Sequence, residues 1–466
     1  MNESAPQSQR YVVMLAATAA LGGFLFGYDS GVINGAVDAL HEAFHTSAAG
    51  TGFAVASVLL GCAVGAFVAG NLADRFGRRP MMLATAAVFL ASAIGSGAAA
   101  DVTVFNLWRL LSGLAVGAAS VLAPTYISEI APPAIRGRLA TLQQMGIVTG
   151  LFASFLCNYL IAQAAGSASA PFWFGAPAWR WMFWVEAVPS LAFLVGSVLI
   201  PESPRFLVVR GRKDEAAAVF ARTGSPNAAE QVAEVERSLG GEDRPRLRDI
   251  LVPGTFRIRP IVWAGIGLSV FQQFVGINVI FYYGAVLWEA AGVSAASALR
   301  DNVITGATNI VATLIAMALI DRLGRKPLLL IGSVGMFVTL GVLTAVFATG
   351  RLGATGNLEL SRTAALIGLT AANVYILSFG ISWGPAVWAM LGEMFSNRYR
   401  AAALAVAGSA QWVANFIVTI TFPPLIASVG LAGAYSLYTA AALASFFFVA
   451  YGLTETRGKS LEEMAA

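Results

Sequence analysis

The stretch Gly22-Gly23-Phe24-Leu25-Phe26-Gly27-Tyr28-Asp29-Ser30-Gly31-Val32-Ile33-Asn34-Gly35 lies in the first long apolar segment of the chain, at about residues 11–37. Glycines in a membrane-length segment let neighbouring helices approach closely. Asp29 is the one carboxylate inside this apolar run. A carboxylate in hydrocarbon costs at least about 2.5 kcal/mol, so we expect Asp29 to have both a partner and a function.

The composition of the chain is that of an integral membrane protein. Of its 466 residues, 57% are hydrophobic and only 12% are charged, whereas a soluble domain has roughly 25% charged residues. A span needs about 20 apolar residues. Such runs are centred near residues 24, 61, 90, 115, 150, 190, 272, 310, 337, 378, 413 and 442. We therefore predict an all-α fold of twelve transmembrane helices.

Several features of the sequence exclude other classes. Residues 1–10 are polar and the first apolar run is too long for a signal peptide, so we expect none. The net charge of +4 is small, which argues against a nucleic-acid partner. Cys62 and Cys157 lie in apolar helices, and we expect both to be packing residues. His41 and His45 are expected to be solvated loop histidines.

Basic residues fall on alternate loops, which predicts the orientation. The loops of one side carry most of the basic residues and are expected to be cytoplasmic. These are Arg75, Arg78, Arg79, Arg136, Arg138, the 205–259 segment, Arg322, Arg325, Lys326, Arg398, Arg400, Arg457 and Lys459. The loops of the opposite side carry only Arg180, Arg300, Arg351 and Arg362. We expect a multi-pass protein of the cell inner (plasma) membrane with both termini in the cytoplasm.

The sequence repeats itself. Asp74-Arg75-Phe76-Gly77-Arg78-Arg79-Pro80 returns as Asp321-Arg322-Leu323-Gly324-Arg325-Lys326-Pro327. Glu129 with Arg136 returns as Glu393 with Arg400, and Pro201-Glu202-Ser203 returns weakly as Thr454-Glu455-Thr456. We predict two pseudo-symmetric six-helix halves, 1–201 and 257–466, the second with a short cytoplasmic tail. A cytoplasmic connector, 202–256, has short helices near 213–218 and 228–239. Such halves are typical of transporters that bind substrate near the membrane midplane.

Three charges fall at a similar depth in the membrane. Counted from the outer ends of their spans, Asp29, Arg109 and Glu186 are each roughly 8–12 Å deep. Arginine is effectively never deprotonated, so Arg109 can hold Asp29 ionised until a proton or a conformational change separates them. A proton symporter needs such an acid. A static ion pair that only fixes helix packing is the alternative.

Polar amides interrupt several apolar spans. Amides both donate and accept hydrogen bonds without carrying a charge, and a buried amide is costly unless it is satisfied. One alone would usually link two helices, but so many favour a polar cavity. Gly380, Gly384 and Pro385 in span 10 also suggest a helix that can flex. The amides are Gln144, Gln272, Gln273, Asn278, Asn309, Gln411 and Asn415.

In combination, these motifs resemble those of a sugar porter of the major facilitator superfamily. They are the two repeated loops, Pro201-Glu202-Ser203-Pro204-Arg205, Gln272-Gln273-Phe274-Val275-Gly276-Ile277-Asn278 and the Glu455-Thr456-Arg457-Gly458 tail. The resemblance covers essentially the whole chain and is to bacterial proton-coupled monosaccharide symporters, and more distantly to animal glucose facilitators. Two positions depart from the family pattern: Met317 replaces a glycine and Thr454 replaces a proline.

The resemblance implies a role for individual residues. Asp29 matches the coupling aspartate, Arg109 its partner arginine, and Glu186 an acid found in some members. Sugar hydroxyls would bind Gln144, Gln272, Gln273, Asn278, Asn309 and Gln411. The cavity walls would be Phe26, Tyr282, Trp388 and Trp412, beside Gly384. A cytoplasmic gate that pairs across the halves would comprise Asp74, Arg75, Arg78, Glu129, Arg136, Asp321, Arg325, Glu393 and Arg400.

We therefore expect a secondary active transporter, a monosaccharide:proton symporter that imports a hexose or pentose, with glucose favoured. The alternatives are a proton-independent sugar facilitator, a myo-inositol symporter and a sugar sensor that does not transport. No nucleophile–base pair or metal cluster is evident, so we expect neither an enzyme nor a cofactor or metal. The expected partners are the sugar, protons and the lipid bilayer, and the family resemblance suggests a functional monomer.

Overall fold

The computed structural model describes residues 4–224, 227–239, 247–252, 255, 257–352, 358–395 and 399–456. Within them, eleven helical stretches are long and apolar enough to cross a membrane. The last, Ala402–Gly452, has 51 residues and is about twice as long as a bilayer core requires. Its backbone leaves the helical conformation at Gly430, where φ is 68°. This break divides it into two spans, so the predicted all-α fold of twelve membrane helices is confirmed.

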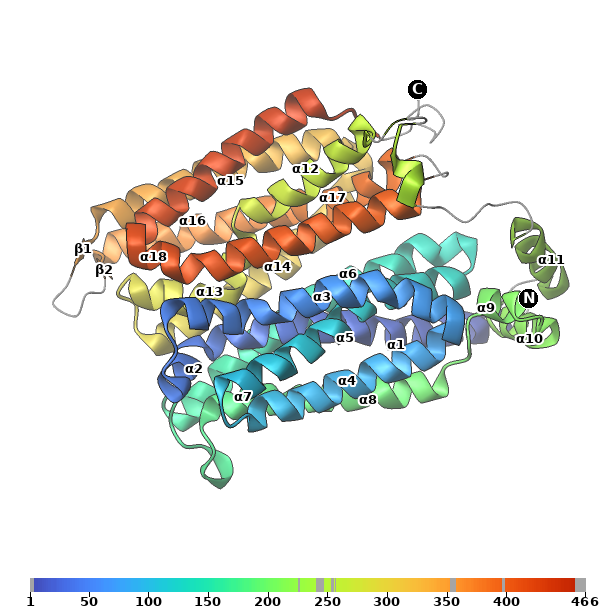
Figure 1. Cartoon of the computed structure of the whole chain (residues 1–466), viewed down its shortest axis with the longest axis horizontal. Coiled ribbons are helices and arrows are strands. Elements are labelled where there is room, and N and C mark those ends of the chain that lie inside the picture. Colours follow the sequence, from blue (N-terminus) through green and yellow to red (C-terminus); the bar gives the residue numbers. More distant parts are fainter. Residues whose placement is uncertain are drawn as a thin grey trace. The chain divides into compact units, whose positions relative to one another are not determined.

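Seven α-helices form the first six spans, and three short helical segments lie at or next to the predicted outer loops (Figure 1). Span 6 is interrupted between α7 and α8, at Glu186. The elements are α1 (Ser4–Val32), η1 (Ile33–Gly35), α2 (Val37–Phe44), α3 (Ala48–Phe76), α4 (Arg78–Ala98), α5 (Val102–Ile130), α6 (Pro133–Ala165), η2 (Trp173–Gly175), α7 (Ala178–Val185) and α8 (Ala187–Leu199).

The connector contains three short helices, α9 (Pro204–Val209), α10 (Lys213–Arg222) and α11 (Ala228–Leu239), followed by η3 (Leu247–Ile250). They confirm the helices predicted near 213–218 and 228–239. The three helices share a small apolar core that includes Leu207, Val219 and Val232. The guanidinium of Arg222 lies 4.4 Å from the ring centre of Tyr11 and so joins the connector to α1.

Spans 7 to 12 follow the connector, and spans 7 and 10 are each made of two helices. Span 7 breaks at Val275–Gly276, where Gly276 has a φ of 84°, and span 10 breaks at Ser382. The elements are α12 (Pro260–Phe274), α13 (Ile277–Ala290), α14 (Ala295–Leu323), α15 (Arg325–Thr349), β1 (Arg351–Leu352), β2 (Leu358–Glu359), α16 (Arg362–Ile381), α17 (Trp383–Met394) and α18 (Arg400–Gly452). The two short strands pair antiparallel.

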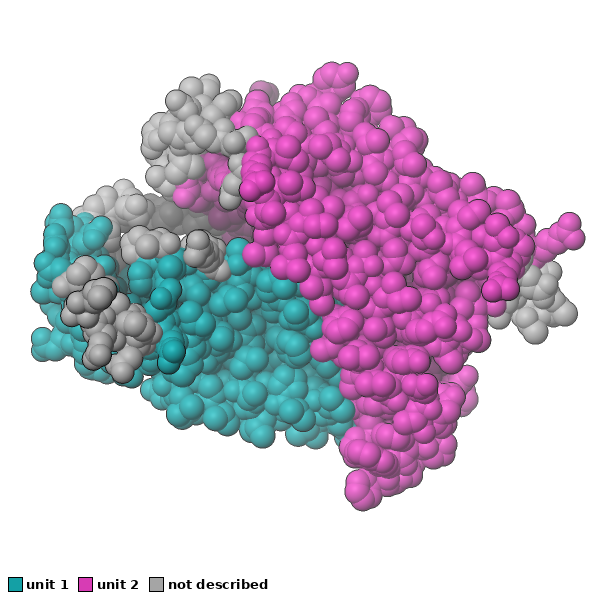
Figure 2. Space-filling view, turned by 180° about the vertical axis from the view of Figure 1, so that it is seen from behind, with its two compact units in different colours: residues 1–29, 60–151, 183–244 teal, residues 30–59, 152–182, 245–466 magenta. Residues whose placement is uncertain are grey.

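Two compact units make up the chain (Figure 2). Unit 1 comprises residues 1–29, 60–151 and 183–244, and unit 2 comprises residues 30–59, 152–182 and 245–466. These units follow the density of contacts rather than the sequence repeat. The division into halves at residues 201 and 257 stays a prediction.

Glycines allow the helices of unit 1 to pack closely, as the opening stretch predicted. A Cβ atom on Gly27 of α1 would overlap the Ile147 carbonyl oxygen of α6. A Cβ atom on Gly150 of α6 would likewise overlap the carbonyl of Phe24. The two backbones are therefore in direct contact on the helical turn that precedes Asp29.

Candidate functional site: a buried ion pair and a chain of amides

Asp29 has the partner that the sequence predicted. Arg109 Nη1 on α5 donates to Asp29 Oδ1 on α1 over 2.7 Å, and Arg109 Nη2 donates to the Asp29 backbone oxygen over 3.2 Å. The two side chains are only 1% and 2% exposed. Breaking such a pair by removing one partner would leave a buried charge uncompensated, which typically costs 3–5 kcal/mol.

The arginine of this pair is also held by an aromatic ring. Its guanidinium lies 5.7 Å from the centre of the Phe183 ring, and Phe183 packs edge-on against Phe105 at 5.5 Å. Phe105 and Arg109 are one turn apart on α5 and therefore lie on the same face of the helix. The ring attracts the cation in a site without solvent, which favours one fixed position of the guanidinium.

Glu186, the third predicted charge, lies at the junction of α7 and α8 and is 1% exposed. It is within electrostatic range of both Asp29 and Arg109. Among the described residues, neither Glu186 Oε1 nor Asp29 Oδ2 has a hydrogen-bond partner. The structure thus brings the three predicted charges into one buried group, with one carboxylate oxygen left unbonded on each acid.

Ser112 belongs to the same group and was not predicted. Its hydroxyl donates a hydrogen bond to Asp29 Oδ1, and the residue is 1% exposed. Ser112 follows Arg109 by three residues on α5, so both side chains project from one helix face. That spacing from a membrane-embedded arginine was the signal available in the sequence.

Three of the predicted sugar-binding amides form a chain across the break in span 7. Asn278 Nδ2 donates to Gln273 Oε1 over 2.5 Å, and Gln273 Nε2 donates to Gln272 Oε1 over 3.4 Å. Gln272 Nε2 in turn donates to the Trp383 carbonyl over 2.9 Å and to that of Gly384 over 3.4 Å. The chain joins the break in span 7 to the break in span 10.

The other predicted sugar-site residues are distributed between the two units. Asn415 Nδ2 lies 3.5 Å from the Tyr282 hydroxyl and Asn309 is buried, all within unit 2. Gln411 has a buried, unbonded Oε1, Trp412 is partly buried on the same helix, and Trp388 is 46% exposed. Phe26 and Gln144 belong to unit 1.

A second cluster of buried amides was missed. Asn34, at the end of span 1, donates from Nδ2 to the Phe281 carbonyl over 2.8 Å. Its Oδ1 accepts from the N–H of Ala285 over 3.1 Å and from Asn302 Nδ2 over 2.7 Å. Residues 281 and 285 are the pair that an undistorted helix bonds together. Between them, Tyr283 has a non-helical φ of −119°.

The first repeated loop forms an ion-pair network within unit 1. Arg78 pairs with Glu129 and with Asp74, each at 3.0 Å. Glu202 accepts from the backbone N–H groups of Arg78 and Arg79, which begin α4, and so places a negative charge at that helix N-terminus. The exposed Arg75 takes no part in an ion pair within the described range.

The second repeated loop has the same construction in unit 2. Arg325 pairs with Glu393 at 2.8 Å, and Glu455 accepts from the N–H groups of Arg325 and Lys326 at the start of α15. The substitution at Thr454 therefore leaves the contacts of Glu455 intact. Arg400 Nε donates to the Phe395 carbonyl rather than to Glu393.

Three further predicted residues lie outside what can be described. The side chains of Arg136 and Asp321, and residue Arg457 of the tail, fall outside the described residues. The expected pairing of the gate charges across the halves stays a prediction, because the ion pairs on Arg78 and Arg325 are each within one unit.

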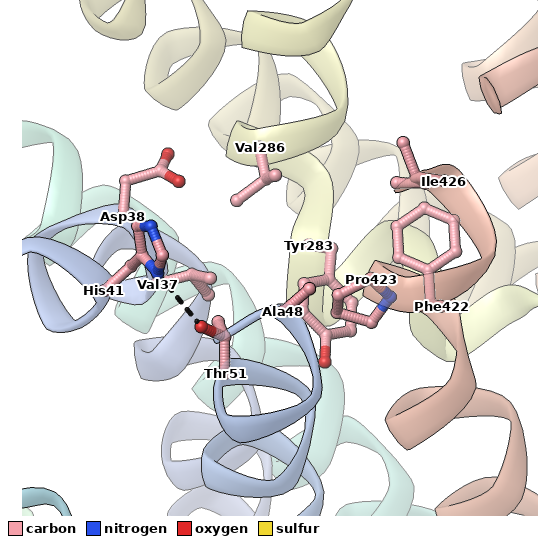
Figure 3. A pocket seen from close by; sticks show the side chains of 10 residues that line it. All are labelled: Val37, Asp38, His41, Ala48, Thr51, Tyr283, Val286, Phe422, Pro423 and Ile426. Carbon is pink, nitrogen blue, oxygen red and sulfur yellow. Dashed lines mark hydrogen bonds between the residues drawn. The ribbon is translucent and has the colours of Figure 1, made fainter. Parts of the chain in front are cut away.

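A small cavity of about 120 Å³ lies in unit 2 beside α2 (Figure 3). Asp38, His41 and Thr51 line one side of it, and Phe422 and Tyr283 are among the residues of the apolar side. Partial burial, and then the nearby Glu42 carboxylate, raise the pKa of Asp38.

The two histidines of this region are exposed, as expected, but His41 lies within α2 and not in a loop. His41 Nδ1 lies 3.4 Å from the Thr51 hydroxyl. Within the described ranges, no group of three His, Cys, Asp or Glu side chains is placed to hold a metal ion.

The fold and the site together define a membrane transporter. The chain has twelve apolar spans, a buried acid–arginine pair, and amides at the breaks of two spans. Comparison with known proteins supports this class. Residues 15–466 match the family described as "Sugar (and other) transporter". The chain therefore belongs to this family of the major facilitator superfamily, which confirms the resemblance and makes it a sugar transporter rather than an enzyme.

Individual relatives are similar along their whole length. The chain is 50% identical to a glucose transport protein from Synechocystis sp., covering 100% of both chains. It is 36% identical to the D-xylose-proton symporter of Escherichia coli, covering 98% of this chain and 95% of the relative. The solved structure of the E. coli xylose transporter XylE, in a partially occluded inward open conformation, matches with a TM-score of 0.83 at 34% identity, covering 97% of this chain and all of the other.

Proposed function

We propose that this chain is a proton-coupled importer of monosaccharides and that glucose is its first substrate. The observation that carries the proposal is the Asp29–Arg109 ion pair, 2.7 Å long and almost fully buried inside the membrane spans. Isolated charges at that depth are costly, and they mark proton or ion pathways in transporters. The glucose transport protein at 50% identity supports the choice of sugar, and the D-xylose-proton symporter supports the coupling.

The proton would be carried by Asp29. Arginine side chains are effectively never deprotonated in proteins, so Arg109 stabilises Asp29 in the ionised form. Protonation of Asp29 removes that attraction and frees the two helices to separate. A cycle that alternates between paired and protonated states can therefore be linked to alternating access. Glu186 interacts electrostatically with both Asp29 and Arg109, and it would be a second proton acceptor on the same path.

The sugar would bind the amides at the breaks of spans 7 and 10. Gln272, Gln273 and Asn278 already exchange hydrogen bonds with one another, so a sugar hydroxyl can replace a bond in the chain without leaving a polar group unpaired. Asn309 and Gln411 would add further hydrogen bonds, and Tyr282, Trp388 and Trp412 would cover the apolar faces of the sugar beside Gly384. The family resemblance also assigns sugar binding to Gln144 and Phe26, which belong to unit 1.

The remaining features follow from the same proposal. The chain would act as a monomer in the plasma membrane of a bacterium, with both termini in the cytoplasm. The networks on Arg78 and Arg325 would then face the cytoplasm and act as the gate between the two six-span halves. Reaction of single cysteines introduced near each terminus with membrane-impermeant thiol reagents, in intact and in opened cells, tests this orientation.

The test of function is uptake of labelled glucose, xylose, galactose and myo-inositol into proteoliposomes, with and without an inward proton gradient. The wild type is compared with Asp29→Asn. Asp301→Asn is the matched control, because Asp301 is also a buried acid beside an arginine, Arg300, but lies outside the proposed proton site. We expect gradient-driven accumulation of glucose in the wild type and the control.

The variant separates the candidate functions. Loss of accumulation in Asp29→Asn with counterflow exchange retained supports symport through Asp29. Equilibration without accumulation in the wild type would instead establish a facilitator with Asp29–Arg109 as a static brace. Binding without flux would identify a sensor, and accumulation of myo-inositol alone would reassign the substrate.

A further inference from the structure

Asp29 Oδ1 is bonded by two donors of different kinds. Arg109 Nη1 is one, at 2.7 Å, and the hydroxyl of Ser112 is the other. Asp29 Oδ2 has no partner among the described residues. The side-chain carboxylate is therefore held through Oδ1 alone, the oxygen that both donors share.

The bond from Ser112 is unusual for a helical serine. Serines inside helices commonly donate back to a carbonyl of their own helix. Ser120, also on α5, does so to the Gly117 carbonyl at 2.7 Å, and Ser92 of α4 does so to Phe89 at 3.0 Å. Ser112 instead donates to a carboxylate on another helix. The Ser112 hydroxyl is thus directed at Asp29 and does not donate to a carbonyl of its own helix.

The two donors differ in what they can do once Asp29 takes a proton. A guanidinium has only donors, so it cannot accept from a protonated carboxyl. A hydroxyl rotates and can either donate or accept. We infer that Ser112 is a positioning residue for the proton-carrying acid: it donates to the charged carboxylate and accepts from the protonated one, so that Asp29 keeps a partner when Arg109 can no longer serve. This inference rests on the proposed proton coupling.

Within the described part of the chain, three titratable groups surround Asp29 in addition to the Ser112 hydroxyl. Arg109 faces it from α5, Glu186 acts on it from the junction of α7 and α8, and Cys62 is within electrostatic range from α3. Among the described residues, neither Glu186 nor Cys62 is hydrogen-bonded to Asp29, whereas Ser112 is. Ser112 is thus the neutral group whose removal should act on Asp29 most directly.

The test compares Ser112→Ala with Ser112→Thr, which keeps the hydroxyl. Ser120→Ala is the matched control on the same helix. The pH profile of gradient-driven uptake in proteoliposomes is measured for each and normalised to counterflow. Ser112→Ala removes a bond from both forms of the acid, but a hydrogen bond to a charged carboxylate is stronger than one with the neutral acid, so the charged form loses more. The midpoint of the profile should therefore move to higher pH, by about one unit. Ser112→Thr should return it to the wild-type value, and Ser120→Ala should leave it unchanged.

A second measurement does not depend on transport. The infrared carboxyl band that disappears in Asp29→Asn is titrated in the purified wild type and in each serine variant. The same upward shift in Ser112→Ala, restored in Ser112→Thr, supports the inference even if uptake proves to be independent of protons, in which case only the proposed function fails. Coincident midpoints for the wild type and Ser112→Ala, or equal shifts in Ser112→Ala and Ser112→Thr, would overturn it.

Discussion

Replacing Gly27 by alanine should force two membrane helices apart next to the proton-coupling acid. An added Cβ would overlap the Ile147 carbonyl oxygen and would lie 2.8 Å from both the Ile147 carbonyl carbon and the Leu151 nitrogen. Favourable contacts between such atoms need about 3.5 Å or more, so α1 and α6 would have to separate by at least roughly 0.7 Å. The obstructing atoms are backbone atoms, which cannot move aside as a side chain can.

Overpacking of this kind typically costs about 1–3 kcal/mol. We expect Gly27→Ala to lower the free energy of unfolding by that amount, measured by tryptophan fluorescence during equilibrium unfolding in mixed detergent and dodecyl sulfate micelles. Gly408→Ala is the control, because a Cβ on Gly408 meets nothing within 4 Å. Alanine there should be neutral or stabilise the helix by up to about 1 kcal/mol.

The same substitution has a functional consequence. Asp29 is two residues beyond Gly27, so a displaced α1 would lengthen the 2.7 Å contact with Arg109. Proton-driven uptake should then fall more than counterflow does. If Gly27→Ala and Gly408→Ala have free energies of unfolding within about 0.5 kcal/mol of each other, the close approach of α1 and α6 described above is wrong.

Four further substitutions test other parts of the structure. Asn34→Ala removes three buried hydrogen bonds and should lower the free energy of unfolding by about 1–3 kcal/mol; an unchanged unfolding midpoint would show that these bonds are not made. Arg78→Gln leaves Glu129, whose side chain is 8% exposed, without its cation, and should cost about 3–5 kcal/mol in the same assay, unless Glu129 finds another partner. Glu455→Gln and Glu202→Gln should each cost about 0.3–1 kcal/mol, because each removes a negative charge at a helix N-terminus; clearly unequal losses would contradict the equivalence of the two loops.

The parts of the site that follow from the free-energy cost of a charge in the membrane could be predicted from the sequence. A carboxylate inside an apolar run demands a partner, and Arg109 was the arginine at matching depth, so this pair could be inferred before any coordinates. The twelve spans followed from length and hydropathy. The repeated loops were equally visible, and the structure extends the repeat to the helix N-termini capped by Glu202 and Glu455.

The parts of the site that depend on the orientation of a side chain, and so on its hydrogen-bond partner, could not be predicted from the sequence. Ser112 lies one helical turn from Arg109, but this spacing does not show whether its hydroxyl donates to Asp29 or, like that of Ser120, to a carbonyl of its own helix. Similarly, Gln272 and Gln273 were expected to bind sugar hydroxyls, but the sequence did not show that they also bond each other and Trp383. Hydrogen-bond partners are set by distances of a few tenths of an ångström, and apolar periodicity does not encode them.

The position of Asn34 has a consequence for how α13 can change shape. Its side-chain amide bonds the carbonyl of Phe281 and the N–H of Ala285, the two backbone groups that would pair in a regular helix. If Asn34 withdraws, those two backbone groups can bond to each other in a regular helical turn. Withdrawal therefore exchanges one set of backbone partners for another and leaves the side-chain amides of Asn34 and Asn302 in need of water or substrate. Two shapes of this helix can thus be close in energy, so a ligand with a modest preference for one of them is enough to choose between them.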